Sequence, residues 1–256
     1  IAEKSDRKDQ AAVTIEKFIP MVAGNGFKGI SFRASAVSIE SKKEKLQTIK
    51  YLLKKYDLVA SMVMGNVDLA ANNENASNCL RFIKPHLDLA DALNCSIVRI
   101  MIKNKDDIKF AQKSADEANE RNITLVQQTH WGTLCETIEQ ANSLVNEIKR
   151  ENFGITFEPA NLMSCGQKIN VSAINSLYPN IINCYFQNIH LTSKGEHVFK
   201  TFCKGDVNLS YVPLSSQKSI NFVKIINQLK KNKYKGWITV HQPLLKNQTV
   251  KDAILE

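Results

Sequence analysis

Short apolar runs alternate with longer amphipathic segments along the whole chain, and this alternation restricts the possible folds more than any other feature. Seven runs favour β-branched and aromatic residues and lack a strict alternation of apolar and polar positions, as expected of parallel strands buried on both faces. They cover residues 27–32, 58–64, 96–102, 123–128, 153–158, 182–191 and 237–242. The pattern predicts a series of parallel βαβ units.

The segments between these runs have the periodicity of amphipathic helices. Residues 134–148 place Ile138, Ala141 and Leu144 on one apolar stripe, and residues 220–229 end in a lysine-rich turn that suits the carboxyl end of a helix dipole. Further helices are expected at about 13–24, 41–55, 77–93 and 106–120. Residues 192–216 show neither pattern and follow a strand, so we expect them to shape a pocket.

Seven strands with one more upstream give the number that closes a (β/α)₈ TIM barrel. A helix precedes the first clear strand, which places the missing strand before it. Residues 1–10 make a poor strand, so the first strand is expected to be degenerate or to lie before Ile1. A doubly wound open sheet is the alternative, but no glycine-rich phosphate turn is present. No linker divides the chain, so we expect residues 1–256 to form a single domain.

Composition narrows the class of protein. The chain has 256 residues and a net charge of +9, which allows anionic partners, but the basic clusters resemble solvated helix faces. No apolar run approaches the roughly 18 residues needed to span a membrane. The six cysteines have no C-x-x-C spacing, which predicts neither a zinc knuckle nor a redox motif. We therefore expect a cytoplasmic protein. The alternative, a protein whose N-terminal targeting signal has been removed, stays open.

Polar residues gather where the predicted strands end. A single strand-end histidine is usually a satisfied structural side chain, but three of the five histidines fall at such positions on different strands. Unpaired charges are costly inside an apolar barrel, so this gathering indicates the rim of an active site. The residues are Arg33, Lys103, Gln128, His130, Glu158, Asn161, His190, His241 and Gln242.

Five segments of the chain follow one another in a recognisable order. They are GFKGISFR at 26–33, ITLVQQTHWGT at 123–133, GITFEPANL at 154–162, NIHL at 188–191, and GDV at 205–207 followed by YKGWITVHQ at 234–242. Together they resemble the xylose isomerase-like TIM barrels, the sugar phosphate isomerase and epimerase group that includes endonuclease IV. The resemblance runs from about Thr14 to Leu244.

The resemblance implies one divalent metal bound by Glu, Asp, His and Glu at four strand ends. Carried over by position, these ligands are Gln128, Glu158, His190 and His241. Only one of the three anionic ligands is retained, so the usual two-carboxylate proton transfer is not available. The remaining two histidines and one carboxylate suit Zn, Fe, Mn or Co better than Mg.

The resemblance leads to one main functional hypothesis. It is a divergent metal-dependent isomerase, epimerase or lyase acting on a sugar, keto-sugar or polyol derivative by proton transfer next to a carbonyl. The predicted proton-transfer residues are Glu158, His241 and His130. The predicted substrate contacts are Arg33, Lys103, Trp131, Asn161 and Lys194, whose cations would suit an anionic substrate.

The alternatives belong to other classes of function. A barrel that has lost catalysis would bind a carbohydrate or a protein partner. DNA repair in the manner of endonuclease IV would need three zinc ions and a larger set of His, Asp and Glu than this chain offers. We therefore expect neither a nucleic acid nor a membrane as partner. Family resemblance also allows a homo-oligomer.

Overall fold

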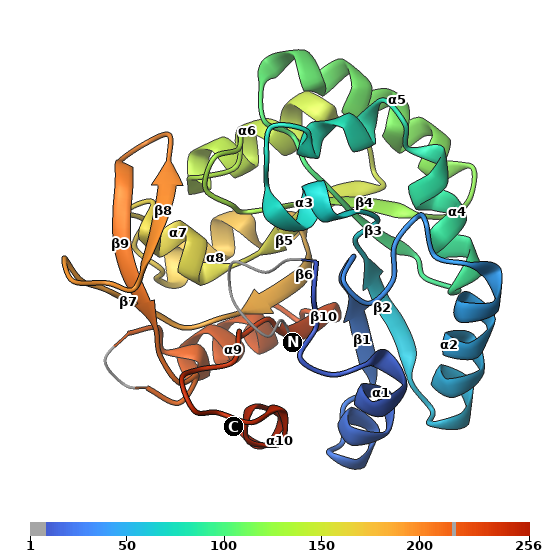
Figure 1. The fold of residues 1–256 in the computed structure, drawn as a ribbon. Coiled ribbons are helices and arrows are strands. Elements are labelled where there is room, and N and C mark those ends of the chain that lie inside the picture. The colour runs from blue at the N-terminus through green and yellow to red at the C-terminus, as the bar shows by residue number, and fades with distance from the viewer. Residues whose placement is uncertain (1–8, 217–218) are drawn as a thin grey trace.

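The computed structural model describes residues 9–216 and 219–256. Seven parallel strands form one curved sheet in the order β1-β2-β3-β4-β5-β6-β10, which makes a nearly closed barrel (Figure 1). The strands are β1 (Gly29–Phe32), β2 (Val59–Val63), β3 (Ile97–Ile100), β4 (Thr124–Gln128), β5 (Phe153–Phe157), β6 (Ile181–Phe186) and β10 (Trp237–Val240). Each lies within one of the seven predicted runs or begins one residue outside it. The TIM-barrel prediction is confirmed.

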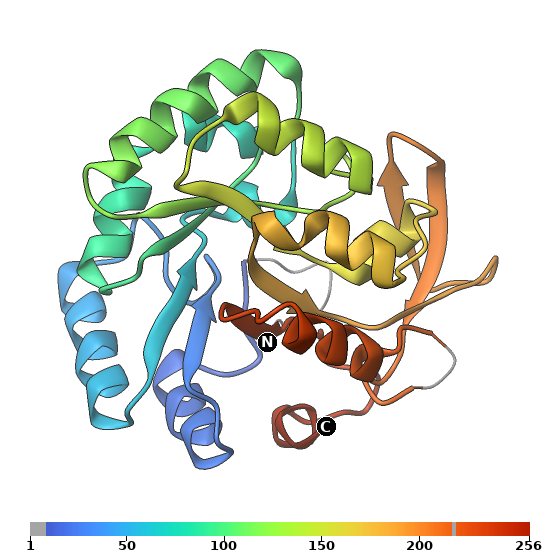
Figure 2. The ribbon, with the colours of Figure 1, turned by 180° about the vertical axis from the view of Figure 1, so that it is seen from behind.

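Helices form the outer layer around these strands (Figure 2). The main ones are α1 (Ile15–Gly24), α2 (Lys43–Lys55), α4 (Lys84–Ala92), α5 (Ile108–Asn119), α6 (Ile138–Ile148), α8 (Val171–Leu177) and α9 (Phe222–Lys231). Shorter elements are α3 (Val67–Ala71), α7 (Pro159–Ser164), α10 (Val250–Leu255) and the 3₁₀ turns η1 (Ala76–Leu80), η2 (Lys105–Asp107) and η3 (Tyr178–Asn180). Within the described part of the chain, no helix is long and apolar enough to cross a membrane.

Two predicted helices differ from the observed ones at identifiable residues. The segment predicted as one helix at 77–93 is η1 followed by α4, and Pro85 stands in the first turn of α4, where its missing N–H costs nothing. The segment predicted at 134–148 becomes helical only at Ile138, because Thr137 and Gln140 form a capping box at that point. In both cases local capping chemistry sets the boundary.

The predicted strand at 182–191 is two strands, β6 and β7 (Ile189–Leu191). The chain leaves the barrel at Asn188, whose backbone N–H donates to the Gln242 side chain at 2.8 Å instead of to a neighbouring strand. The Asn188 amide donates in turn to the carbonyl of Pro213 at 2.9 Å and accepts from the N–H of Ile220 at 3.2 Å. These bonds redirect the backbone out of the barrel.

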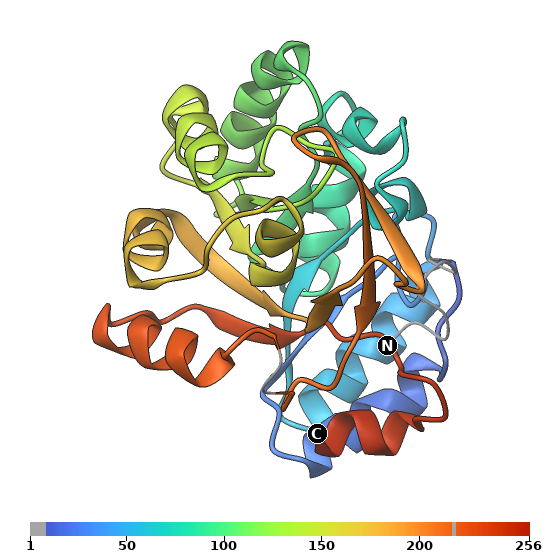
Figure 3. The ribbon, with the colours of Figure 1, turned by 90° about the vertical axis from the view of Figure 1, so that its left-hand side faces the viewer.

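Residues 192–216 were expected to lack regular structure, and this expectation is wrong. They contain β8 (His197–Thr201) and β9 (Gly205–Tyr211), which pair antiparallel and form a three-stranded sheet in the order β7-β9-β8. Figure 3, turned so that this sheet faces the viewer, shows the β8–β9 hairpin beside the barrel. Its inward side chains Phe199 and Leu209 are buried, which attaches the hairpin to the main core.

The barrel is open between β1 and β10. Within the described residues these two strands are not paired, and a cavity of about 360 Å³ separates them. Gly29 and Trp237 lie at one end of this cavity, and Arg33 and His241 at the other. The expected eighth strand belongs in this position. The poor strand predicted at 1–10 falls largely on residues 1–8, which lie outside the described residues.

Candidate active site at the barrel opening

Glu158 is the central residue of the candidate site. It follows β5 directly and precedes Pro159, the first residue of α7, so the turn from strand to helix fixes its backbone. The side chain is fully buried. Its Oε2 accepts hydrogen bonds from the amides of Gln128 and Asn161, the latter at 3.0 Å. Thr129 holds the same turn, because its hydroxyl accepts from the Glu158 N–H at 2.8 Å.

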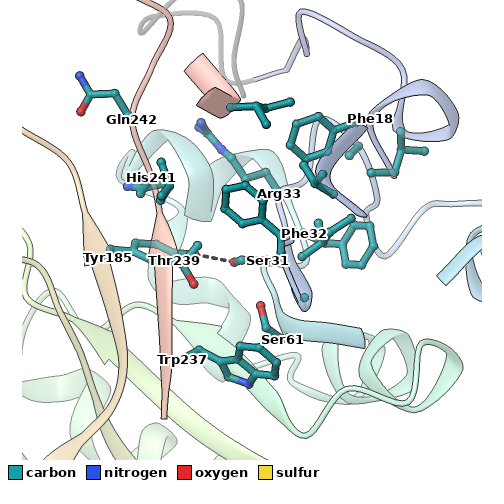
Figure 4. Close-up of a pocket in the computed structure, with 18 of the residues that line it drawn as sticks. Phe18, Ser31, Phe32, Arg33, Ser61, Tyr185, Trp237, Thr239, His241 and Gln242 are labelled. Atoms are coloured by element: carbon teal, nitrogen blue, oxygen red, sulfur yellow. Dashed lines mark hydrogen bonds between the residues drawn. The ribbon is translucent and has the colours of Figure 1, made fainter. Parts of the chain in front are cut away.

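His241 connects this carboxylate to the cavity. It follows β10, and its Nδ1 lies 3.6 Å from Glu158 Oε1. The imidazole stacks on the buried Tyr185 ring, with centroids 4.2 Å apart. The His241 side chain is 21% exposed whereas Glu158 is fully buried, so only the histidine of this pair reaches the cavity. Figure 4 shows His241 beside Tyr185, with Arg33, which directly follows β1, across the opening.

Two arginines act on the same buried region. Arg33 lines the cavity, and Arg99 is buried inside the barrel on β3. Burial lowers the pKa of both guanidinium groups, that of Arg99 to about 10, while the nearby charge of Glu158 opposes the shift in each case. The Nε atoms of both arginines are buried without a hydrogen-bond partner among the described residues. The interior therefore holds two cationic groups against one carboxylate.

Tyr185 is fully buried at the centre of this region. Its hydroxyl lies 2.8 Å from the Ser31 hydroxyl, the contact drawn in Figure 4. Burial raises the pKa of Tyr185, and the charges of Arg99 and Arg33 partly offset that rise. Tyr185 therefore stays protonated at neutral pH and offers a neutral hydrogen-bonding group to the cavity.

A second polar group forms at the ends of β3 and β4. The Lys103 ammonium donates to the backbone carbonyl and side-chain oxygen of Asn72, both at 3.0 Å. The Asn72 amide lies 3.2 Å from His130 Nδ1 and donates to the Trp131 carbonyl at 2.8 Å. Burial lowers the pKa of Lys103. Asn72 therefore links two of the predicted site residues.

Some predicted residues lie apart from Glu158 and His241. His190 is exposed on β7, where it pairs with Ser210, and Lys194 is exposed in the turn before β8. Trp131 stacks on Phe199 of the hairpin, with centroids 5.2 Å apart. Of the nine strand-end residues, Glu158, Gln128, Asn161 and His241 form one contiguous group.

The four predicted metal ligands do not form one ligand set. In the described part of the chain, one group of three His, Cys, Asp or Glu side chains brings its ligand atoms within 4.8 Å of one another, and it consists of Glu136, Cys165 and Cys203. Gln128 turns its amide nitrogen toward Glu158 and thus presents a donor there. One carboxylate beside two guanidinium groups does not fit a divalent cation in this arrangement.

Sequence reasoning missed three residues of the site. Arg99 carried a signal, because an arginine in the middle of an otherwise apolar strand must find a counter-charge inside the barrel. Tyr185 carried none, since a tyrosine in a strand usually packs. Asn72 has a left-handed backbone conformation with φ 51°, and no sequence motif predicted this conformation or its place in the site.

The family model of the xylose isomerase-like TIM barrels matches residues 19–254. The chain belongs to this family. That match spans nearly the whole chain and agrees with the sheet order, the resemblance of five segments and the position of Glu158 after β5. A search among curated protein sequences gives no match.

Solved structures share the fold at low identity. A probable 3-DHS dehydratase from Bacillus anthracis is 17% identical with a TM-score of 0.73, covering 98% of this chain and 93% of that one. A xylose isomerase-like protein from Mycobacterium smegmatis in complex with magnesium is 14% identical, with a TM-score of 0.68 and coverage of 93% and 84%. A 3-keto-D-glucoside 4-epimerase from E. coli is 10% identical, with a TM-score of 0.63 and coverage of 94% and 93%.

Proposed function

We propose that this chain is an isomerase, epimerase or lyase that moves a proton next to a carbonyl group of a sugar, keto-sugar or polyol derivative. The family assignment supports a sugar-modifying enzyme in general. Two of the proteins that share the fold, a probable 3-DHS dehydratase and a 3-keto-D-glucoside 4-epimerase, are named for reactions of this class. The observation that carries the proposal is the pairing of buried Glu158 with His241 at the edge of a cavity that Arg33 also lines.

In this proposal His241 is the general base. Glu158 faces Nδ1 and stabilises the proton on that nitrogen, which leaves Nε2 to take a proton from the substrate carbon beside the carbonyl. The resulting enediolate is anionic. The positive charge of Arg33 stabilises it from the other side of the opening, in the way an oxyanion hole does. Glu158 is then a positioning residue, because its carboxylate does not reach the cavity.

His130 is the second proton-transfer residue that we propose. Its Nδ1 contacts the Asn72 amide, and Asn72 in turn accepts a hydrogen bond from Lys103. These contacts fix the orientation of the imidazole. Trp131 beside it supplies an apolar wall, and Lys103 and Lys194 supply positive charge for an anionic substrate. Asn161 acts indirectly, through its hydrogen bond to Glu158.

The metal-dependent form predicted from the sequence, with Gln128, Glu158, His190 and His241 as ligands of Zn, Mn, Fe or Co, does not fit the side chains as they lie here, so we propose the reaction without an ion at Glu158. Elemental analysis of protein purified without chelators, compared with Glu158→Ala, tests it. Loss of one equivalent of metal in Glu158→Ala relative to wild type would support the metal-dependent form, and an equal metal content in the two proteins would contradict it.

Proton exchange tests the proposed reaction directly. Candidate keto-sugars and their phosphates are incubated with the enzyme in D₂O, and NMR follows loss of the C–H signal next to the carbonyl. We expect His241→Asn to abolish enzyme-dependent exchange and Glu158→Gln to lower kcat by about 10²–10⁴-fold. The exposed Glu139 on α6 supplies the matched control, since Glu139→Gln should leave the rate unchanged.

The outcomes separate enzyme from binding protein. Exchange that survives in both His241→Asn and Glu158→Gln would contradict the proposed dyad. Thermal stabilisation by a sugar without exchange or turnover would indicate a barrel that binds but does not catalyse.

We further propose a cytoplasmic location and allow a homo-oligomer. All six cysteines are free thiols in the structure, which supports a reducing compartment. Fractionation of cells and sedimentation velocity of the purified chain test these two statements.

A further inference from the structure

Three potential ligands that are far apart in the sequence meet beside the β8–β9 hairpin. Glu136 lies in the connection between β4 and α6, Cys165 directly follows α7, and Cys203 lies in the turn between β8 and β9. One carboxylate oxygen and the two sulfur atoms all lie within 4.8 Å of one another. None of these residues contributes to the site around Glu158. The cluster therefore requires its own explanation.

The Glu136 carboxylate is held in a fixed position by backbone donors. It is fully buried, and its Oε1 accepts from the N–H groups of Gly132 at 2.6 Å and Phe202 at 2.7 Å. Its Oε2 accepts from the N–H of Cys203 at 2.8 Å. A carboxylate oxygen can accept a second interaction, so Oε2 keeps the capacity to bind a ligand on the side of the thiols.

The two thiols differ in access but share the same electrostatic surroundings. Cys165 is buried and Cys203 is exposed, so solvent can reach the cluster through Cys203. Burial raises the pKa of both thiols, and the negative charge of Glu136 raises both further. The neighbourhood therefore disfavours additional negative charge unless a cation enters it.

The geometry points to a binding site for a thiophilic divalent cation such as Zn²⁺, held by the Glu136 carboxylate and the thiolates of Cys165 and Cys203. Two sulfurs and one carboxylate oxygen form a donor set typical of zinc and cobalt, with a fourth position left for solvent. Each thiol loses one proton to solvent when the ion binds, so two protons are released per ion. The two positive charges of the ion balance the two thiolates thus created, and the single negative charge of Glu136 remains.

Occupation of this site would fix the hairpin against the barrel. Cys203 and Phe202 are at the turn, and Phe199 on β8 stacks on Trp131, the neighbour of His130. An ion joining the turn to the β4–α6 connection and to the end of α7 would hold these three segments together. Figures 1 and 2 show the hairpin at one side of the barrel, outside the ring of helices. The expected effect is a raised melting temperature, because the folded state brings the three ligands together and therefore binds the ion more tightly than the unfolded chain.

Cobalt titration provides the test because cobalt thiolates absorb in the near ultraviolet through sulfur-to-metal charge transfer. The reduced chain is titrated with Co²⁺, and the band should saturate at one ion per chain. Cys203→Ser and Cys165→Ser should each lose most of the band. Cys95→Ser is the matched control, because Cys95 donates to the Ile97 carbonyl at 3.3 Å and a serine hydroxyl can make the same bond.

Zinc supplies the second measurement, since Zn²⁺ should displace Co²⁺ and raise the melting temperature of the wild-type chain but not of Cys203→Ser. Cys203 is exposed, so this variant is expected to fold. Absence of the cobalt band in the reduced wild type, or its survival in both cysteine variants, would overturn the inference. Glu158→Gln should keep the band in full, which separates this site from the metal predicted at Glu158.

Discussion

Because of the buried side chain of His86, the free energy of unfolding of this protein should decrease in mildly acidic solution. It is only 1% exposed on α4, and its Nδ1 is buried without a hydrogen-bond partner among the described residues. Burial lowers the pKa of His86 from 6.5 to about 4. In the unfolded chain the same group titrates near its ordinary value. Between these two values the unfolded state binds more protons than the folded state, so acid favours unfolding.

The size of the effect follows from the two pKa values. A shift of this size corresponds to about 3 kcal/mol of unfolding free energy once the pH is below both values. The stability that depends on an uncharged His86 is almost fully present at pH 7, and it is lost as the pH falls from 6.5 toward 4. Between pH 7 and pH 5 the folded chain should lose about 2 kcal/mol through His86 alone.

Urea unfolding at pH 7 and pH 5 measures this contribution. Other groups also titrate in this range, so the informative quantity is the difference in pH dependence between wild type and His86→Leu. The variant should lose about 2 kcal/mol less than wild type over this interval. Leu87→Val on the same helix removes buried volume without removing a titratable group, and it should keep the wild-type pH dependence. Equal losses in wild type and His86→Leu would refute the reasoning.

Three further predictions concern stability and are measured by urea unfolding at pH 7. Gly65→Ala should cost about 2 kcal/mol, because the new Cβ would lie 2.0 Å from Nδ1 of His86, and His86→Ala should partly restore stability in the double variant. Asp107→Ala should cost about 3 kcal/mol, because this fully buried carboxylate accepts from Arg81 at 3.0 Å and from two backbone N–H groups. Tyr234→Phe should cost about 1 kcal/mol, because the hydroxyl lies 3.1 Å and 3.0 Å from backbone carbonyls of β6 and β10. Stabilities within 0.5 kcal/mol of wild type would contradict each of them.

The barrel could be predicted from the sequence because its signals are local. Each strand is a short run of β-branched and aromatic residues, and each helix has its own apolar stripe, so the order of elements follows from reading along the chain. The hairpin β8–β9 was missed because apolar residues occur on its exposed as well as its buried side, with Val198 and the turn residue Phe202 exposed and Phe199 buried. Its pairing depends on contact with the barrel, which no short window of sequence contains.

The candidate site was predictable only in part, for a related reason. Strand ends of a parallel barrel meet at one rim, so Gln128, Glu158 and His241 could be grouped before the structure was known. The exit of the chain from the barrel at Asn188 moves His190 away from them, and this depends on contacts with Gln242 far along the sequence. The proximity of Cys165 and Cys203 could not be predicted for the same reason, since spacing rules detect only ligands that are close in sequence.

The charge balance inside the barrel favours one kind of chemistry over another. A divalent metal and a pair of arginines are alternative ways to stabilise an anionic intermediate, and placing both beside a single carboxylate would leave uncompensated positive charge in a buried space. The charge of Arg33 lowers the pKa of Arg99, and the charge of Glu158 raises the pKa of both arginines. A substrate that becomes an anion beside His241 would relieve the repulsion between the two arginines. The stabilisation is then larger in the transition state than in the free enzyme, which is the condition for catalysis rather than for binding alone.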